Sequence, residues 1–307
     1  MIVYRELSSL ERELGIPVKT LYAVSNSLSR HYRTVQIPKK SGGLRKLSVP
    51  DEILRKIQRQ IAGTLLVHMP VSRYASAYRF GSTTLKNARP HVGKTLLLKL
   101  DILHFFDSIR YSAVKDAAFP PEIYAGNIRI LLAMLCYYKD ALPQGAPSSP
   151  AITNILLFDF DETVGFWCRE RGIAYTRYCD DMTFSGDFEP QEVICFVREK
   201  LRKLGFLLNE QKTRVQRAGQ RQSVTGIVVN EKPNVSAAYR RKLRQEVYYC
   251  QRFGVAGHLR QIGQQIPEDA YLKHLLGKVN YVLQVSPEER GMKAARQWLL
   301  EQLKQAE

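Results

Sequence analysis

Two adjacent aspartates, Asp180 and Asp181, stand in the middle of AYTRYCDDMTFSG, residues 174–186. Both flanks are rich in β-branched and aromatic residues, so the segment predicts a hairpin that carries its acids at the tip. Two carboxylates so close together repel each other, and a nearby cation is a natural reason for keeping them there. A solvated Asp-Asp turn is the alternative that this feature alone leaves open.

A third aspartate ends the apolar run TLLLKLD, residues 95–101, which predicts a buried strand with Asp101 at its last position. Joining a 3′-hydroxyl to the α-phosphate of a nucleotide needs charge compensation on the attacking and leaving oxygens. Two Mg²⁺ ions about 3.5–4 Å apart supply it. Magnesium takes oxygen ligands, usually one or two carboxylates for each ion. Asp101, Asp180 and Asp181 therefore predict a two-magnesium catalytic site.

The surrounding pattern predicts an α+β fold. Alternation on either side of Ser41-Gly42-Gly43 predicts a hairpin, and residues 224–230 predict one short strand. Helices are expected over residues 5–30, 126–138 and 190–204, from an N-cap at Asp51 to residue 66, and from an N-cap at Ser149 to Arg169. The middle of the chain thus reads β–helix–β–β–helix–β, and the part after residue 236 reads as helical, with breaks near 254–257 and 286–287.

Charge predicts a polyanionic partner. The chain has 46 Lys and Arg against 29 Asp and Glu, a net charge of +17, and the basic residues cluster between Arg30 and Lys56 and again from Arg240 to Arg244. Such an excess costs self-repulsion unless a polyanion offsets it. A merely soluble basic surface and a membrane surface are the alternatives, but no lipidation motif or strongly apolar helix face supports the second.

Other classes of protein fit less well. No apolar run approaches the roughly 20 residues that span a bilayer, and the first residues lack a signal pattern, so a soluble cytoplasmic protein without a membrane partner is expected. Five scattered cysteines without a C-x-x-C pair argue against a disulfide framework or a structural zinc site. Residues 88–95 fit a relaxed phosphate-binding loop, but an apolar strand follows them where that motif needs a helix.

Four segments resemble, in order, the motifs of reverse transcriptases. The segment LKLDILHFFDSI (98–109) is similar to their first catalytic motif, and LPQGAPSSP (142–150) to their template and nucleotide loop. Tyr178-Cys179-Asp180-Asp181 resembles their Y-x-D-D box, and LGFLLNEQKT (204–213) resembles the motif with a lysine near the leaving pyrophosphate. Two further elements, Asn87 to His91 and Val224-Thr225-Gly226, resemble the N-A-x-x-H and V-T-G elements of retron reverse transcriptases. Cys179 departs from the alanine that many of those enzymes carry.

The resemblance implies a right-hand polymerase with fingers over residues 1–95 and partly 110–141, a palm with an antiparallel sheet over 96–232, and a helical thumb over 233–307. It implies that Asp101 and Asp180 bridge two Mg²⁺ ions, that Asp181 supports them, and that dNTPs are the substrates. The residues that it places near the nucleotide are Lys39, Lys40, Arg45, Phe106, Gln144, Gly145 and Lys212. Those that it places near RNA are Asn87, His91, Val224, Thr225, Gly226, Arg240, Arg241, Arg244 and Tyr248.

Retron membership further implies a dedicated structured non-coding RNA that serves as template and primer, a DNA chain begun on an internal 2′-hydroxyl, and a phage-defence role with a separate effector protein. A group II intron-like reverse transcriptase and a non-catalytic RNA-binding protein on the same fold are the alternatives. Only 77 residues follow Asn230, which leaves room for a thumb but not for a maturation or ribonuclease H domain.

Overall fold

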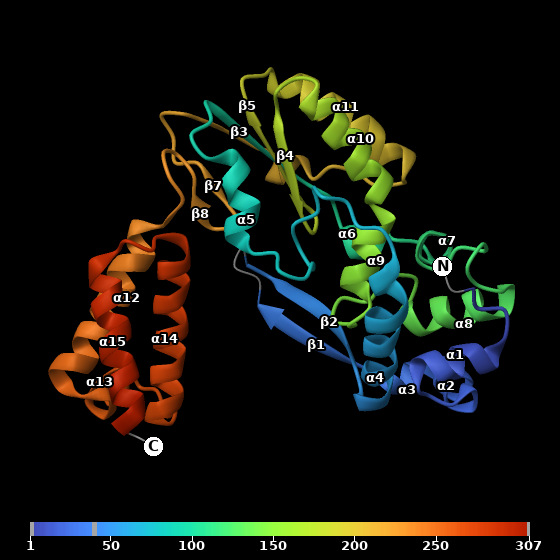
Figure 1. Ribbon diagram of the computed structural model, residues 1–307, viewed down its shortest axis with the longest axis horizontal. Coiled ribbons are helices and arrows are strands. Elements are labelled where there is room, and N and C mark those ends of the chain that lie inside the picture. Colours follow the sequence, from blue (N-terminus) through green and yellow to red (C-terminus); the bar gives the residue numbers. More distant parts are fainter. Residues whose placement is uncertain (1–2, 39–41, 306–307) are drawn as a thin grey trace. The chain divides into compact units, whose positions relative to one another are not determined.

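The computed structural model describes residues 3–38 and 42–305, and the chain divides into two compact units (Figure 1). Unit 1 comprises Met1–Ser82, Leu98–Phe184 and Phe188–Arg214, and unit 2 comprises Thr83–Leu97, Ser185–Asp187 and Val215–Glu307. The finer division into fingers, palm and thumb stays a prediction.

Unit 1 contains most of the expected helices. Its helices are α1 (Leu7–Leu14), α2 (Val18–Ser25), α3 (Leu28–His31), α4 (Glu52–Gln60), α6 (Phe105–Ser108), α7 (Tyr111–Ala118), α8 (Gly126–Cys136), α9 (Ser149–Leu156), α10 (Phe158–Arg169) and α11 (Pro190–Lys203). Asp51 caps α4 as expected, since its carboxylate accepts a hydrogen bond from the Leu54 amide. A π-helical turn (Ile61–Leu65) and a 3₁₀ turn (Leu66–His68) continue α4.

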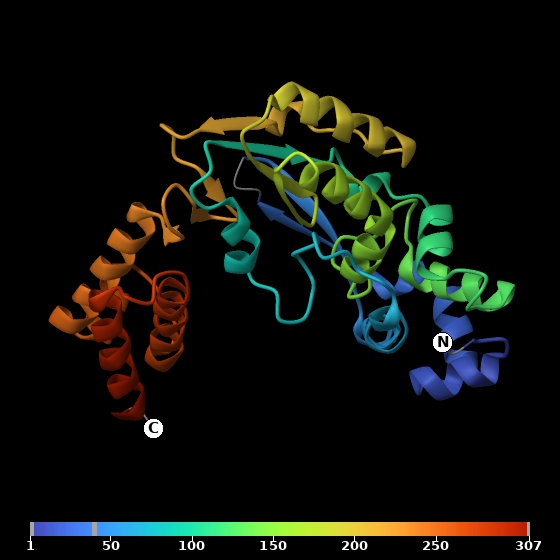
Figure 2. The same ribbon diagram turned by 45° about the horizontal axis from the view of Figure 1, so that its top comes forward.

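A four-stranded sheet carries the candidate catalytic residues. Its order is β4 (Ala174–Tyr178), β5 (Asp181–Gly186), β3 (Leu96–Asp101) and β6 (Arg214–Arg217). The predicted hairpin with acids at its tip is confirmed as β4–β5. Because β5 pairs with β3, the tip lies beside the end of the strand that carries Asp101. Helix α10 packs on β4, and α11 packs on α10 (Figure 2).

The hairpin predicted near residues 34–50 is also confirmed. Strands β1 (Tyr32–Pro38) and β2 (Leu44–Pro50) pair antiparallel, from Tyr32 opposite Pro50 to Pro38 opposite Leu44. This ribbon exposes apolar side chains, with Ile37 43% and Leu44 57% accessible to solvent. Lys39, Lys40 and Ser41, which follow β1 in the sequence, lie outside the described residues.

Two expected elements differ from the structure. The helix expected from Ser149 to Arg169 is interrupted at Leu157, and its N-cap is Ser148, because the Ser149 hydroxyl instead donates to the Pro143 carbonyl (2.8 Å). The single strand expected at 224–230 is a pair of short antiparallel strands, β7 (Ser223–Val224) and β8 (Ile227–Val228). Thr225 and Gly226 both have positive φ, the geometry of a tight turn, and this turn chemistry outweighs the run of β-forming residues.

Unit 2 is built on a separate hydrophobic core. It contains α5 (Thr84–Ala88), a 3₁₀ turn (Arg89–His91), β7, β8, β9 (Asn234–Val235), α12 (Ala237–Phe253), α13 (Val255–Gln261), α14 (Glu268–Val285) and α15 (Arg290–Gln305). Val247, Leu275, Val279 and Met292 are among its buried core residues. The helices after residue 236 break at both expected places, and a further break, which was not predicted, lies between Gln261 and Glu268. Across residues 3–38 and 42–305, no helix has the length and apolar character needed to cross a membrane.

Candidate active site

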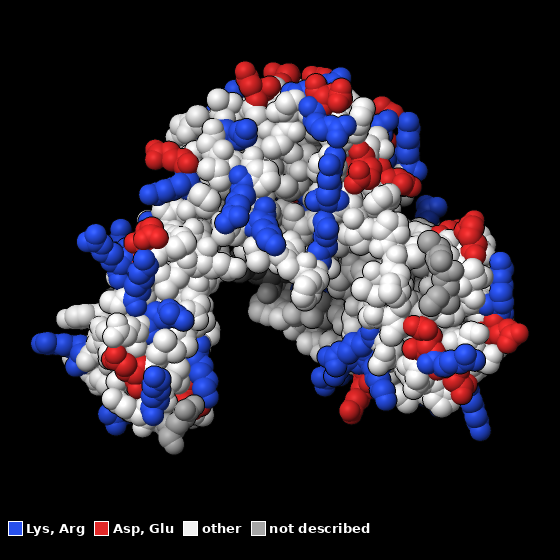
Figure 3. Space-filling view, viewed as in Figure 1, with Lys and Arg blue, Asp and Glu red and all other residues white. Residues whose placement is uncertain are grey.

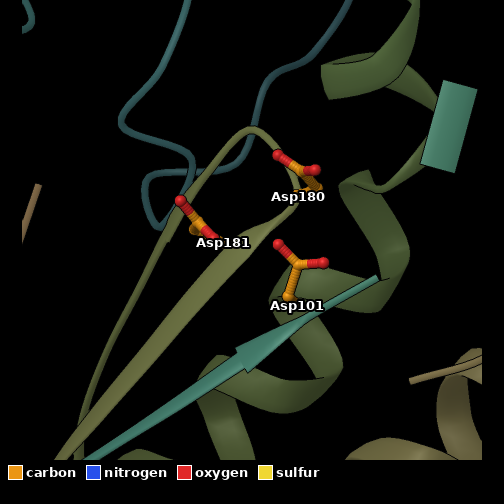
Figure 4. A group of neighbouring side chains, drawn as sticks. All are labelled: Asp101, Asp180 and Asp181. Carbon is orange, nitrogen blue, oxygen red and sulfur yellow. The ribbon is translucent and has the colours of Figure 1, made fainter. Parts of the chain in front are cut away.

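Three carboxylates meet at one edge of the sheet in unit 1. Asp101 ends β3, Asp180 lies at the tip of the β4–β5 hairpin, and Asp181 begins β5 (Figure 4). One oxygen from each lies within 4.8 Å of the others. Among the described residues, no other group of three His, Cys, Asp or Glu side chains has this proximity. The convergence expected from the sequence is therefore present.

Backbone hydrogen bonds fix the positions of these acids. The Ile102 amide donates to the Asp180 carbonyl (3.3 Å), which joins the end of β3 to the hairpin tip. The Asn209 amide donates to the Asp101 carbonyl (2.8 Å), and its side-chain amide donates to the Asp101 carboxylate (3.3 Å). At the tip itself, Cys179 has φ +61, which turns the chain within two residues. Asn209 was not predicted as a site residue.

Without a cation, the site disfavours the charged forms of its aspartates. Desolvation, and then the charge of Asp101, raise the pKa of Asp180 above its ordinary range. Desolvation, and then the charges of Asp180 and Asp101, raise the pKa of Asp181 to about 7. A bound cation relieves both causes, because it compensates the charge that the neighbours repel.

Lys212 supplies one positive charge to the site. Its ammonium lies 2.8 Å from the Asp101 carboxylate, while more than half of the side chain is exposed. Although partial desolvation acts in the opposite direction, the hydrogen bond and charge of Asp101 raise the pKa of Lys212. Its expected place near a leaving pyrophosphate stays a prediction, and to reach a phosphate the lysine has to leave Asp101.

The donor set suits a hard divalent cation. All three ligand groups are carboxylates, and the group contains no histidine or cysteine. Oxygen-only sets of this kind favour magnesium or manganese over zinc and copper.

The hairpin tip also carries a buried thiol, that of Cys179. Burial, and then the charge of Asp180, raise the pKa of Cys179 to about 12, so this thiol stays protonated. The Tyr78 hydroxyl donates to its sulfur at 3.6 Å, and Tyr78 itself has φ +58. Cysteine thus fits at the variable position of the Y-x-D-D box. Tyr78 was missed because its segment has no regular pattern.

The predicted nucleotide residues of unit 1 lie on several elements. Phe106 is half-buried in α6, and its carbonyl accepts from the Leu142 amide (3.1 Å), which ties α6 to the Gln144 loop. The Gln144 carbonyl accepts from the Ser48 amide (2.9 Å). A Cβ on Gly145, which has φ +118, would lie 2.9 Å from the Ser48 carbonyl oxygen, so this position requires glycine.

Of the three basic residues expected to bind the triphosphate, the structure describes one. Arg45 is exposed on β2, opposite Ile37 in the ribbon. Lys39 and Lys40 lie outside the described residues.

The two retron-like elements contact each other inside unit 2. The Asn87 amide donates to the Thr225 hydroxyl (3.4 Å), which in turn donates to the Thr84 carbonyl (3.2 Å). His91 shares a hydrogen bond with the Ser185 hydroxyl (2.7 Å). The side chains of Asn87, His91 and Val224 are fully buried, so in this structure they hold the core together rather than face a partner.

The residues of α12 that were expected near RNA divide into two groups. Arg241, Arg244 and Tyr248 are exposed, whereas Arg240 is half-buried and pairs with Glu289 (3.5 Å). Figure 3 shows Lys and Arg side chains standing on the surface of the C-terminal helices. The exposed group is thus available to a polyanion.

Comparison with known proteins agrees with this geometry. The family "Reverse transcriptase (RNA-dependent DNA polymerase)" matches residues 37–229. The retron Mx65 reverse transcriptase of Myxococcus xanthus is 32% identical over 96% of this chain and 71% of its own length, and the Mx162 enzyme of the same organism is 29% identical over 91% and 64%. A solved apo telomerase from Candida tropicalis aligns with a TM-score of 0.46 at 14% identity, over 67% of this chain and 55% of its own.

The family match and the retron relatives confirm the predicted α+β right-hand polymerase fold and the predicted activity. They exclude the non-catalytic alternative. The phosphate-binding-loop alternative fails on structure as well, because Lys94 and Thr95 lead into β3 and not into a helix. The chain belongs to the retron reverse transcriptases, RNA-directed DNA polymerases that depend on a divalent metal.

Proposed function

We propose that this enzyme copies part of one cognate structured RNA into single-stranded DNA with two Mg²⁺ ions held by Asp101, Asp180 and Asp181. The observation that carries the proposal is the meeting of these three carboxylates, within 4.8 Å, at the strand ends. Asp101 and Asp180 would hold both ions, and Asp181 would support them. When bound, the ions offset the charge on the attacking and leaving oxygens of the reacting phosphate.

The reaction forms a bond between a ribose hydroxyl oxygen and the α-phosphorus of a dNTP, and breaks the bond from that phosphorus to the bridging oxygen of pyrophosphate. The proton of the attacking hydroxyl passes to solvent. Lys212 leaves Asp101 and gives a proton to the departing pyrophosphate. Arg45 binds the triphosphate, together with Lys39 and Lys40, because guanidinium and ammonium groups pair with phosphate oxygens.

The other predicted nucleotide-binding residues select the substrate by its shape. Phe106 lies beneath the sugar and excludes a 2′-hydroxyl. Gln144 and Gly145 approach the nucleotide and template. Residue Gly145 supports the assignment, because its loop is bonded to β2 through the Ser48 amide and leaves no room for a side chain.

The RNA serves as both template and primer, and the first DNA residue is joined to the 2′-hydroxyl of an internal guanosine. The exposed residues Arg241, Arg244 and Tyr248 of α12 bind the backbone of this RNA, since duplex RNA is recognised largely through shape, phosphates and 2′-hydroxyls. Other residues expected near RNA contribute indirectly, by fixing the core against which α12 packs. They are the buried Asn87, His91 and Val224, the half-buried Arg240 and the turn at Thr225-Gly226.

The relatives also suggest the setting. Their bacterial origin supports work in the bacterial cytoplasm, and retron membership supports a phage-defence role with a separate effector protein and with the DNA product as a further partner.

One preparation tests this proposal. The protein is purified from its host, and the bound nucleic acid is digested separately with ribonuclease and with deoxyribonuclease. We expect one species on a denaturing gel that each enzyme shortens, because it consists of a small DNA covalently joined to RNA. DNA synthesis from an annealed primer with no RNA–DNA branch would overturn the self-priming assignment and favour a group II intron-like enzyme.

A further inference from the structure

A fully buried ion pair lies behind the catalytic turn. Arg177, on β4, and Asp161, on α10, have no solvent-exposed side-chain surface, and two parallel hydrogen bonds join them (2.8 and 2.5 Å). The Tyr175 hydroxyl donates to the same carboxylate (2.8 Å). Replacing such a pair with apolar side chains is often neutral or stabilising, so stability alone is a weak reason for its presence.

The pair leaves one arm of the guanidinium free, and this arm reaches the turn. The Arg177 Nη1 donates to the Cys179 carbonyl (2.9 Å) and to the Asn154 side-chain carbonyl (3.3 Å). The Cys179 carbonyl belongs to the residue with φ +61 that directly precedes Asp180. Because the peptide bond is planar, holding this oxygen fixes the plane that contains the Asp180 nitrogen.

The same arginine also anchors the segment that faces the turn. Its amide donates to the Tyr74 carbonyl (2.8 Å), and its carbonyl accepts from the Ser76 amide (2.7 Å). Asn154 donates in turn to the Ala77 carbonyl (2.9 Å). One residue thus holds both segments. The backbone of Arg177 bonds the segment that leads to Tyr78, whose hydroxyl contacts Cys179, and its side chain bonds the turn that carries Asp180.

We propose that Arg177 is a positioning residue that sets the geometry of the metal-binding turn, with Asp161 fixing the orientation of its guanidinium. The role needs three separate donor directions, two for Asp161 and one for Cys179. Arginine provides these in a rigid plane, and lysine does not. The proposal rests on the proposed metal-binding role of Asp180.

The test compares three variants with the wild-type enzyme. Asp161→Asn with Arg177→Gln removes the clamp without leaving a buried charge, and Arg177→Lys keeps the charge but loses the third donor direction. Asp116→Asn with Arg129→Gln is the matched control, because Arg129 likewise bonds a carboxylate (2.7 Å) and a backbone carbonyl, that of Phe119 (2.6 Å), but on other elements.

Four quantities are measured at a temperature where thermal melting shows each variant folded. They are the single-turnover extension rate on a primed RNA template, the KM for dNTP, Mn²⁺ affinity by electron paramagnetic resonance, and hydrogen exchange of the amides of residues 178–182. For the clamp variant we expect a roughly 10–100-fold lower rate, weaker Mn²⁺ binding, faster exchange in the turn and an almost unchanged KM.

Wild-type rate, Mn²⁺ affinity and exchange in the folded clamp variant would overturn the proposal and leave Arg177 as a packing residue. If that variant does not fold, Arg177→Lys decides by the same criteria. An equal loss in the control pair would also overturn it. Failure of the metal site itself is distinguishable, because Asp180→Asn would then retain both activity and Mn²⁺ binding.

Discussion

Asp101, Asp180 and Asp181 extend from the ends of strands into one shared site, whereas Asn87, His91 and Val224 point into the core of unit 2. Both groups stand in segments that resemble family motifs. The carboxylates of the first group repel one another and need a cation to be stable as anions. In the second group, the Asn87 amide nitrogen bonds Thr225 and the His91 ring bonds Ser185. A sequence motif thus shows that the residue type matters at a position. Burial and hydrogen bonding then tell whether the residue binds a ligand or supports the fold.

The largest effect is expected at the acids. Asp101→Asn or Asp180→Asn removes a metal-bridging charge but keeps the shape, so DNA synthesis should fall by about a thousandfold or more, above about 4 kcal/mol in barrier height. Primer extension measures the loss, and RNA binding measured by filter retention should survive. Near-normal extension by either variant would place the metals elsewhere.

A contrasting effect is expected at the buried motif residues. His91→Ala deletes a fully buried ring and its bond to Ser185, so it should lower the free energy of unfolding by about 2–4 kcal/mol. Denaturant unfolding measures this. At a temperature where the variant is folded, its RNA affinity should equal that of the wild type. A loss of RNA affinity with unchanged stability would instead make His91 a direct RNA contact.

The sugar-selecting role of Phe106 gives a smaller change. Phe106→Val opens space beneath C2′ and should raise ribonucleotide incorporation relative to deoxyribonucleotide on the order of tenfold. Side-by-side incorporation efficiencies test this, with Phe105→Leu as the neighbouring control, since Phe105 is buried against Phe206. An unchanged ratio for Phe106→Val would assign that ring to packing.

The exposed face of α12 should affect binding and not chemistry. Arg241→Ala with Arg244→Ala should weaken cognate RNA more than an unrelated primed template, and each lost phosphate contact should flatten the salt slope by roughly 0.7–0.9. The control is Arg240→Ala, whose side chain pairs with Glu289 and which should chiefly alter stability. An equal loss of affinity for both substrates would show that this face binds nucleic acid without selecting the cognate RNA.

The smallest effect concerns pH. In the metal-free enzyme the pKa of Asp181 is raised from 3.8 to about 7, so the folded state binds more protons than the unfolded state between these values. Its contribution to stability is therefore lost as pH rises through about 7. Metal-free melting temperatures at about pH 5.5 and 8 should differ more for the wild type than for Asp181→Asn. Equal differences in melting temperature would show that folding does not raise the pKa of Asp181.

The sequence predicted what local pattern and residue chemistry determine. The β4–β5 tip, the strand that ends at Asp101 and the helical breaks near residues 254 and 286 all follow from propensity and turn residues. Long-range partners did not follow. Asn209 approaches Asp101 across 108 positions, and Arg177 meets Asp161 between a helix and a strand, so neither contact has a local signature. A charged residue inside the apolar strand β4 was the one signal that could have pointed to Arg177.

The metal site is tested most directly by diffraction from crystals soaked in Mn²⁺ and a nonhydrolysable dNTP. The account predicts two anomalous peaks about 3.5–4 Å apart, bridged by Asp101 and Asp180 and contacted by Asp181. The same soak of Asp180→Asn crystals should lose at least one peak. Peaks away from these carboxylates, or none at saturating Mn²⁺, would contradict the assignment of this site.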